Sequence, residues 1–436
     1  MNRAPDQIRG CNRPVIPSEV EESLDLVWKI SDFSTALDMT NEIRHTMETF
    51  DVAIVGGGPA GSSCAAFCAL AGLHTLVLER GRFPREKVCG DCLNPSCWPV
   101  LERLGLTQRV WDLTHSKLTS VEFIAIDGHK IIVDFPTAED CELSIKRSLF
   151  DNLLLKRACD LGVHVREEKT VTALKHSNSE KTCSHGPVAR PVLCAPQESG
   201  YNVFQPGWKI ETNSGESFLA RVLVGADGRN STVARLRNLL PRPARERVAL
   251  QAHIPLPRNF GKRVVLQFLR EGYSGQAPVN ETELNLCLVG RPPTISRLRQ
   301  WAQRHFEIPA DQPWRTITPL TRAPVPCANE NLLFIGDAAR VVEPFTGEGI
   351  YYALRSGELA AGAIAKIISG KGRQFAFREF VRASAEMYRG RLWINRLARA
   401  AVLSPRIGSL FVRAARINPS ILKLLTTRIV RSSPVG

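Results

Sequence analysis

The chain has 436 residues, 44% of them hydrophobic, and a formal net charge of +14. This length suits one large domain or two interleaved domains, and the composition excludes disordered, collagen-like and coiled-coil proteins. With no run of 18 apolar residues and no cationic region followed by an apolar stretch, we expect neither a transmembrane helix nor a secretory signal. The twelve scattered cysteines are typical of reduced thiols, which predicts a cytoplasmic protein on the inner side of a membrane.

The first elements predict an α/β fold. Residues 1–46 show no useful periodicity, and Met39 or Met47 can serve as the start, so we treat this segment as an extension or a start-site artefact. A buried strand is predicted at Phe50–Val55, an alanine-rich helix at Pro59–Gly72 and a second strand at Thr75–Leu78. A strand, a helix and a strand in this order open a parallel, doubly wound sheet.

The rest of the chain alternates between this sheet and a second, β-rich part. Strands are predicted within Thr119–Phe135, a helix at Arg147–Leu161, and a long surface loop from His176 to Gly207. Further elements follow: strands at Trp208–Glu211, Phe218–Val224, Val248–Ile254, Arg263–Leu269, Glu283–Val289 and Leu332–Ile335, and helices at Ile295–His305 and from Gly349. We therefore expect a discontinuous Rossmann-type domain (47–135, 140–240 and 328–370) interleaved with a β-rich substrate domain (245–327 and the strands near 119–135), then a basic helical region (371–436).

The clearest motif is the glycine turn Gly56–Gly61, which follows a strand and opens a helix. Gly56 permits the tight turn, Gly58 lets the backbone approach a pyrophosphate, and Gly61 lets helix and strand pack closely; Pro59 and Ala60 complete the motif. The helix N-terminus offers free amides to the phosphates. Glu79, eighteen residues after Gly61, suits a ribose diol. The motif predicts dinucleotide binding, and we add Arg80 to the site.

Two later turns each place one aspartate at the end of an apolar strand. The first contains Asp227 and Gly228, and the second contains Gly336 and Asp337. Such an aspartate can bond a ribityl hydroxyl or organise a loop around a phosphate. Either turn alone is commonly structural, but after the glycine motif, in this order, both are predicted to bind the cofactor.

Together these motifs resemble the FAD-dependent aromatic hydroxylase superfamily, and within it the geranylgeranyl reductase-like branch. The resemblance covers about residues 50–370, and its strongest marks are the segments 87–91, 336–339 and 344–350. It implies FAD as cofactor, with Glu79 on the adenosine ribose, Arg147 at the middle of the cofactor and Asp337 on the ribityl chain. The loop 344–349, with Gly347 and Gly349, would run past the isoalloxazine ring. The helix that follows would favour the negative charge of reduced flavin.

Cys89 is the candidate catalytic residue. By the same resemblance it would lie near the substrate face of the flavin, as a proton donor or as a wall of the pocket. The spelling Cys89-Gly90-Asp91-Cys92 is also CxxC, but no second pair exists at zinc-binding spacing and the flanks are unlike a thioredoxin motif, so we expect no metal. Cys92 and Cys97 are interpreted as packing residues.

The sequence leaves three activities open. The first is reduction of carbon–carbon double bonds in an apolar, isoprenoid-like or polyene substrate. The second is hydroxylation of an apolar or phenolic substrate, and the third is electron transfer to a quinone. The YxWxFP-like segment of the reductase branch is replaced by residues 272–279, which puts a prenyl substrate in doubt, and the WxWxIP segment of halogenases is absent. Since no second GxGxxG motif is present, NAD(P)H would donate electrons by binding transiently against the flavin.

The positive charge is concentrated at the C-terminal end. No acidic residue follows Glu386, whereas ten Lys or Arg side chains, interleaved with apolar ones, lie between Arg389 and Arg431. This pattern fits an anionic membrane surface better than nucleic acid, although an ordinary capping helix with solvated arginines has the same composition. We therefore predict peripheral contact with the inner membrane face through residues 389–431.

Overall fold

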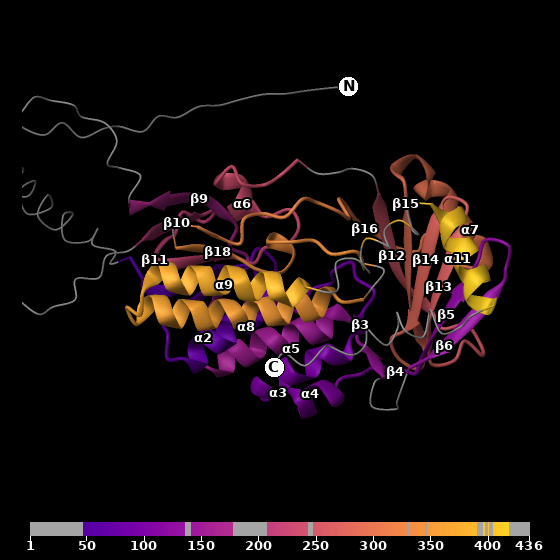
Figure 1. Cartoon of the computed structure of the whole chain (residues 1–436), viewed down its shortest axis with the longest axis horizontal. Coiled ribbons are helices and arrows are strands. Elements are labelled where there is room, and N and C mark those ends of the chain that lie inside the picture. Colours follow the sequence, from indigo (N-terminus) through magenta and orange to yellow (C-terminus); the bar gives the residue numbers. More distant parts are fainter. Residues whose placement is uncertain are drawn as a thin grey trace, which may run out of the picture. The chain divides into compact units, whose positions relative to one another are not determined.

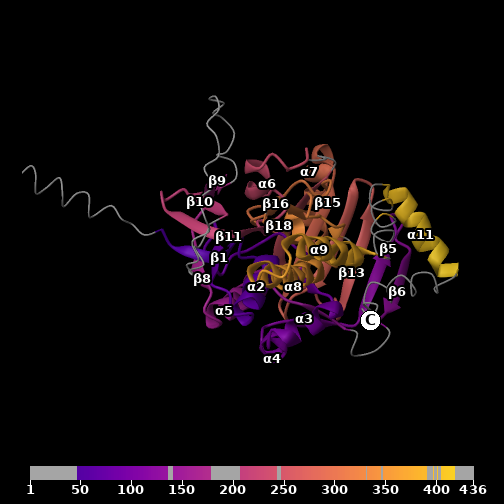
Figure 2. The ribbon, with the colours of Figure 1, turned by 60° about the vertical axis from the view of Figure 1, so that its left-hand side comes forward.

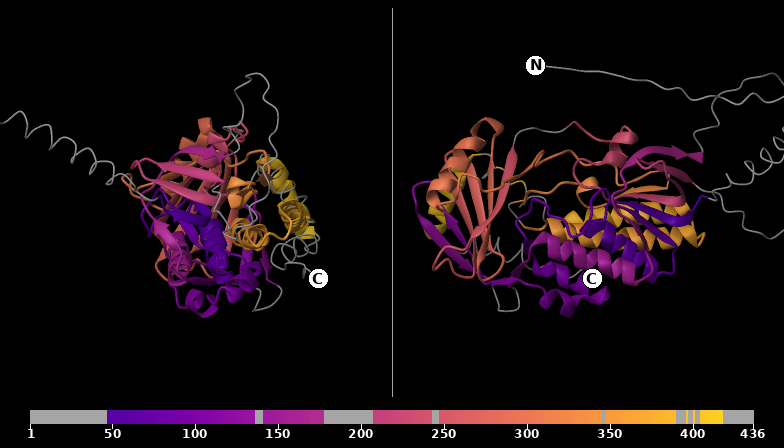
Figure 3. Two further views of the ribbon diagram at one scale, coloured as in Figure 1. Left: turned by 90° about the vertical axis from the view of Figure 1, so that its left-hand side faces the viewer. Right: turned by 180° about the vertical axis from the view of Figure 1, so that it is seen from behind.

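The structure is a computed structural model that describes residues 47–135, 141–177, 207–242, 247–329, 331–344, 347–389, 396, 400 and 404–417. The extension predicted over 1–46 and nearly all of the loop predicted between His176 and Gly207 lie outside these residues. The described residues from 48 onward form one compact unit. Its two large sheets lie at opposite ends in Figure 1 and, seen from behind, in Figure 3.

The first sheet has a parallel centre built around β1 (Thr49–Val55). Its order is β17 (Ala328–Asn329), β18 (Leu332–Phe334), β11 (Ser217–Gly225), β1, β2 (Thr75–Leu78) and β8 (His164–Arg166), with β9 (Val171–His176) and β10 (Trp208–Thr212) continuing from β11. Alternate residues of β1 enter two hydrophobic cores, Val52 and Ile54 on one face and Ala53 and Val55 on the other. Burial on both faces is what a central parallel strand requires.

Helices cover one face of this sheet. These are α2 (Pro59–Leu70), α5 (Arg147–Asp160), α8 (Gly349–Ile368) and α9 (Arg373–Tyr388), and α2 packs against both α5 and α8. Short helices α3 (Trp98–Arg103) and α4 (Thr107–Trp111) lie beyond α5, and α6 (Thr232–Leu236) is on the opposite side (Figure 1). The packing of α2 on α8 brings the first and last cofactor motifs of the chain together.

The second sheet has seven strands drawn from two parts of the chain. Its order is β16 (Arg315–Ile317), β12 (Val248–Pro255), β15 (Glu283–Gly290), β14 (Gly272–Pro278), β13 (Arg263–Leu269), β5 (Ser120–Ile124) and β6 (Lys130–Asp134). Helix α7 (Ile295–His305) packs on one face, and α11 (Pro405–Ile417) lies along β5, β6 and β13 on the other (Figure 2). A small sheet of β3 (Cys92–Leu93), β7 (Glu142–Ser144) and β4 (Ser116–Leu118) completes the unit.

The predicted α/β class is confirmed, and the strands and helices predicted within the described residues are present to within a few residues. Strand β14 was missed because glycines, serine and proline are poor strand formers. In the structure it is a central, mostly buried strand between β13 and β15. A side chain at Gly272 would lie 2.0 Å from the Val289 carbonyl oxygen, so close backbone approach explains the composition. No helix in the described part of the chain has the length and apolarity to cross a bilayer.

Candidate active site

The glycine turn between β1 and α2 has the geometry that the motif predicts. Gly56 has a φ of +105°, which only glycine adopts readily. A side chain at Gly61 would lie 1.8 Å from the Gly56 carbonyl oxygen, so the start of α2 packs directly on the turn. At Gly58, by contrast, an added Cβ would meet only the Arg85 guanidinium, at 3.5 Å. Gly56 and Gly61 therefore shape the fold, whereas Gly58 leaves space for a ligand.

Glu79 follows β2 and is held by the glycine turn itself. Its carboxylate accepts one hydrogen bond from the Gly57 amide at 2.7 Å and another from the Gly81 amide at 2.9 Å. The side chain is buried, and Arg85 lies 3.6 Å away. Since a carboxylate has about four acceptor positions, two remain for a diol. Arg80, the next residue, is exposed.

The two strand-end aspartates have different surroundings. One carboxylate oxygen of Asp227 accepts hydrogen bonds from the amides of Thr232 and Val233, at 2.6 and 3.2 Å, in the first turn of α6. Asp337 lies in the turn after β18, where its carboxylate accepts a hydrogen bond from Arg229 at 3.0 Å. Burial alone would raise the pKa of Asp337, but the charges of Arg229 and Lys87 lower it. Asp227 thus organises its loop, and Asp337 is kept ionised.

A large, mostly apolar cavity of about 340 Å³ lies between the first sheet and the second. Nine predicted site residues line it: Gly58, Pro59, Ala60, Cys89, Arg147, Gly228, Asp337, Gly347 and Gly349. The other six, which do not line it, are Gly56, Gly61, Glu79, Arg80, Asp227 and Gly336. The structure therefore brings residues from both ends of the chain to one cavity. Phe345 and Thr346 of the predicted flavin loop lie outside the described residues.

The Cys89 segment is anchored to the second sheet through its backbone. The carbonyl oxygen of Cys89 accepts hydrogen bonds from the side chains of Gln251, Asn285 and Cys287, at 2.9, 2.8 and 3.3 Å. Two residues later, the buried Asp91 carboxylate lies 2.8 Å from the His253 ring nitrogen. These contacts fix Cys89 at the cavity wall. Cys92, interpreted as a packing residue, also lines the cavity, whereas Cys97 is fully buried.

Three cations from different parts of the chain also face the cavity. Arg147, at the start of α5, is buried and makes two hydrogen bonds to Asp151, at 2.7 and 2.8 Å. Arg229 reaches Asp337, and burial together with the charge of Arg147 lowers the pKa of Lys87. Roles for Lys87 and Arg229 were not predicted. Lys87 begins the segment 87–91 that carries the family resemblance, and Arg229 directly follows Gly228, so their positions beside predicted motifs are the signal that points to them.

Glu142, on β7, is a further cavity residue that the sequence did not single out. It is 7% exposed and lies among mostly apolar side chains. Burial, and then the nearby Glu348, raise its pKa from 4.5 to about 7. The sequence gives no signal for this residue, because its strand β7 (Glu142–Ser144) is only three residues long and contains no recognisable motif. Only the tertiary structure reveals this carboxyl group.

The cavity fits FAD by the chemistry of its walls. Like Gly58, Gly347 and Gly349 leave space beside the backbone: a Cβ at either of the latter two would meet nothing within 4 Å. These glycines therefore offer a surface against which a flat ring can lie. The cations Lys87, Arg147 and Arg229 suit a pyrophosphate. Asp337, on the cavity wall, suits ribityl hydroxyls, and Glu79, which lies against the glycine turn outside the cavity lining, suits ribose hydroxyls. Each end of the predicted cofactor thus has partners of matching chemistry.

Comparisons with known proteins agree with this reading. Residues 49–185 match a family described as an FAD binding domain. The chain is 28% identical to a menaquinone reductase of Mycolicibacterium smegmatis, over 71% of this chain and 75% of that protein. It is 24% identical to a digeranylgeranylglycerophospholipid reductase of Methanococcus vannielii, over 76% and 80% of the two chains.

Solved structures share the fold. The flavin-dependent brominase Bmp2 superposes with a TM-score of 0.66 at 19% identity, covering 88% of this chain and 94% of that one. PqsL of Pseudomonas aeruginosa, described as a probable FAD-dependent monooxygenase, gives 0.65 at 19% identity, covering 83% and 100%. These structures confirm the Rossmann-type fold, and the FAD binding domain match and the reductase relatives support the predicted resemblance to FAD-dependent enzymes.

Proposed function

We propose that this chain, an FAD-dependent oxidoreductase that resembles the aromatic hydroxylase superfamily, reduces carbon–carbon double bonds of an isoprenoid lipid. The observation that carries the proposal is the composition of the cavity beyond the flavin-binding turns. Its far wall is formed by apolar side chains of the second sheet, including Val121, Val264, Leu266 and Phe268. An apolar wall of this kind favours a long hydrocarbon over a polar metabolite.

The named relatives support this substrate class. Both the menaquinone reductase and the digeranylgeranylglycerophospholipid reductase act, by their names, on lipids that carry isoprenoid chains. Each relative covers more than two thirds of this chain. The shared substrate chemistry is the unsaturated isoprenoid chain, and we assign that chemistry to this cavity.

Bound FAD, once reduced, would supply a hydride, which carries two electrons. NAD(P)H is the proposed source of these electrons. The chain's own residues then have three tasks. Lys87, Arg147 and Arg229 hold the phosphates, the anchored Cys89 segment closes the cavity on the side of the second sheet, and the apolar wall excludes water from the alkene.

A flavin monooxygenase acting on an apolar or phenolic substrate is the alternative, favoured by the fold shared with PqsL. Electron transfer to a quinone is a lesser alternative, which the name of the menaquinone reductases favours. The three activities differ in what reoxidises the reduced flavin. A reductase uses the alkene, a monooxygenase uses oxygen, and an electron carrier uses the quinone ring.

We further propose that α11 presents the cavity to an anionic membrane. Ile407, Gly408 and Val412 of this helix line the cavity, and Ile407 is 54% exposed, so it lies at an opening. Leu410 is also exposed, at 64%, and Arg406 and Arg413 are exposed beside it. Exposed apolar and basic side chains on one helix suit an anionic bilayer. A lipid substrate could then enter without crossing water.

The test is anaerobic reoxidation of the reduced holoenzyme, followed by flavin absorbance in single turnover. Geranylgeranyl lipids, a menaquinone, a saturated menaquinone analogue and phenolic lipids are compared. Rapid reoxidation by unsaturated isoprenoids, with a product two hydrogens heavier, supports the proposal. Reoxidation by the saturated analogue as well would point to the quinone ring as acceptor. Reoxidation only after oxygen is added, with hydroxylated product, would point to the monooxygenase.

A further inference from the structure

Glu142 is a buried acid at the wall of the proposed reaction cavity. Its strand β7 lies between β3 and β4 in the small sheet, and its side chain lines the same cavity as Cys89 and the glycines of the flavin loop. Only 7% of the residue is exposed. A carboxyl group in such a place is held in contact with whatever occupies the cavity.

No cation neutralises this carboxyl group within the described residues. Arg147 is paired with Asp151, and Arg229 with Asp337, at 2.7 and 3.0 Å. The titratable groups whose charges interact with Glu142 are Glu348, ahead of α8, and the thiols of Cys92 and Cys97. None of them favours ionisation. Burial and Glu348 raise the pKa of Glu142 to about 7, so it holds a proton near neutral pH.

We propose that Glu142 is the catalytic acid that protonates the substrate alkene and that Cys89 only forms part of the cavity wall; this inference rests on the proposed reductase function. The π bond of the alkene breaks as one carbon accepts hydride from the reduced flavin and the other accepts the Glu142 proton. Two C–H bonds form, the O–H bond of the carboxyl group breaks, and oxidised FAD and a carboxylate remain. Solvent returns the proton, and a nicotinamide donor returns the electron pair.

The chemistry of the neighbouring groups favours the carboxyl of Glu142 over the thiols of Cys92 and Cys287. An efficient general acid has a pKa near the working pH, which holds for Glu142. Burial raises the pKa of the Cys92 and Cys287 thiols well above their usual range, so they release a proton poorly. The charge of the carboxyl group also suits this role. Glu142 is neutral when the hydride arrives, and reprotonation from solvent removes the buried negative charge that proton transfer leaves on it.

The first experiment needs no substrate. Infrared difference titration of the FAD-loaded protein, wild type against Glu142→Gln, follows the carbonyl stretch of a protonated carboxyl group. The proposal expects a band assigned to Glu142 that disappears with a midpoint near pH 7. Glu86→Gln, which changes an exposed acid, is the matched control and should retain the band. A carboxylate already ionised at pH 6 would overturn the proposal, whatever the substrate is.

The second experiment measures single-turnover reoxidation of the reduced flavin by the alkene. Glu142→Gln should keep its FAD and its rate of reduction but slow reoxidation by about 10²–10⁴-fold, the usual contribution of a general acid. The wild-type rate should fall as pH rises through about 7, and this dependence should be lost in the variant. Glu142→Asp, which keeps the acid, should recover part of the rate.

Cys89→Ser distinguishes the two donors. If Glu142 delivers the proton, Cys89→Ser should raise the substrate KM, because Cys89 lines the cavity, but should keep the dependence of the reoxidation rate on pH around 7. Loss of reoxidation in Cys89→Ser with a normal rate in Glu142→Gln would overturn the assignment and restore the thiol as donor. If no alkene reoxidises the wild type, the reductase function fails, and the infrared titration still decides whether Glu142 stores a proton.

Discussion

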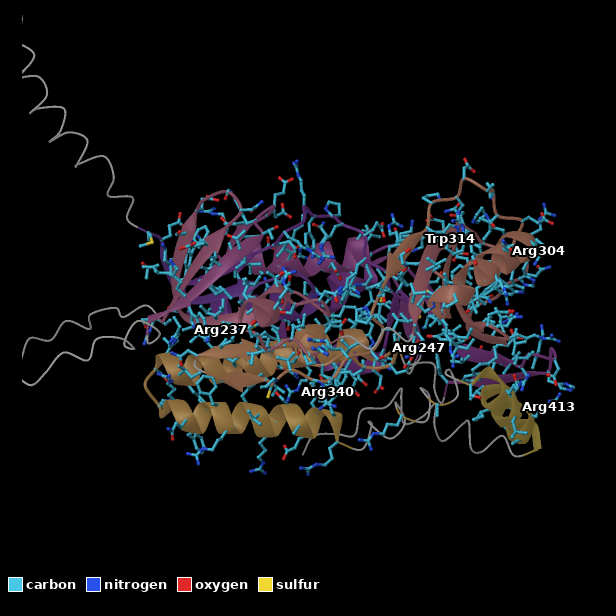
Figure 4. All side chains as sticks on the ribbon, turned by 90° about the horizontal axis from the view of Figure 1, so that it is seen from above. Arg237, Arg247, Arg304, Trp314, Arg340 and Arg413 are labelled. Carbon is cyan, nitrogen blue, oxygen red and sulfur yellow. The ribbon has the colours of Figure 1, made fainter. Side chains whose placement is uncertain are left out.

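Arg247 and Glu343 form a buried ion pair with two hydrogen bonds, at 3.0 and 2.6 Å, that ties the start of β12 to the segment before the flavin loop. Arg247 lies between the two sheets in Figure 4. Both side chains are almost fully buried, at 3% and 2% exposure. The pair therefore joins the second sheet to the cofactor site at the edge of the cavity.

Removing one partner of this pair should be costly, because it leaves an opposite charge buried without its main partner. We expect Glu343→Gln to lower the free energy of unfolding by about 3–5 kcal/mol, measured by denaturant titration of the holoenzyme. The exposed pair Arg382–Glu386 provides the control, since Glu386→Gln should cost no more than about 0.5 kcal/mol. Equal losses in both variants would show that burial of the pair is unimportant.

Two glycines of the first turn should separate cofactor binding from folding. Gly58→Val should yield folded protein that retains little FAD, because the added side chain extends into the space left for the pyrophosphate. Gly61→Val should instead fail to fold, since its Cβ would overlap the Gly56 carbonyl oxygen. Flavin content and circular dichroism distinguish these outcomes. Full flavin occupancy in Gly58→Val would contradict the site.

Substitutions of the two strand-end aspartates, Asp227 and Asp337, should have different effects on FAD affinity and on stability. Asp337→Ala removes a charge-assisted hydrogen bond worth roughly 1.5–3 kcal/mol, so FAD should bind about ten- to a hundredfold more weakly. Asp227→Ala removes the acceptor of two amides in the first turn of α6 and should lower stability by about 0.5–2 kcal/mol, with a smaller effect on affinity. Fluorescence titration of the apoprotein with FAD measures both. An unchanged affinity in Asp337→Ala would make that turn structural.

The raised pKa of Glu142 links stability to pH. Between about 4.5 and 7 the folded state binds this proton and the unfolded state does not, so stability falls as pH rises through this window. The burial penalty reaches its full size above pH 7, where Glu142→Gln should be more stable than wild type by up to about 3 kcal/mol. The two proteins should converge near pH 4.5. Parallel pH profiles of the melting temperature would contradict the assignment.

The membrane proposal predicts that the protein pellets with anionic vesicles and is released as the salt concentration rises. Each basic side chain near the surface contributes about 1 kcal/mol of attraction, and salt screens this attraction. Leu410→Glu on α11 should reduce vesicle binding at least tenfold through lost apolar contact and added repulsion. Phe375→Glu, which changes a similarly exposed apolar residue on α9, is the control. Equal binding to neutral and anionic vesicles would exclude an electrostatic anchor.

The local motifs were predictable because each has a physical signature in consecutive residues. The turn Gly56–Gly61 has the predicted tight geometry, and Glu79 lies against it through the Gly57 amide, whereas its role at a ribose stays a prediction. Strand β14 and the Glu142 carboxyl were not predictable, because their roles depend on partners distant in sequence. Gly272 is explained only by Val289 across the sheet, and the pKa of Glu142 only by the cavity around it.

The parallel pairing of β13 with β5 has a consequence for protein engineering. Since β5 and β6 precede the helix α5 of the cofactor domain, the seven-stranded sheet is not a contiguous segment of the chain. Exchanging residues 247–317 alone with a relative would therefore place foreign strands against the native β5. A chimera that alters substrate preference must transplant residues 119–135 together with 247–317, and crossovers between these blocks are expected to yield insoluble protein.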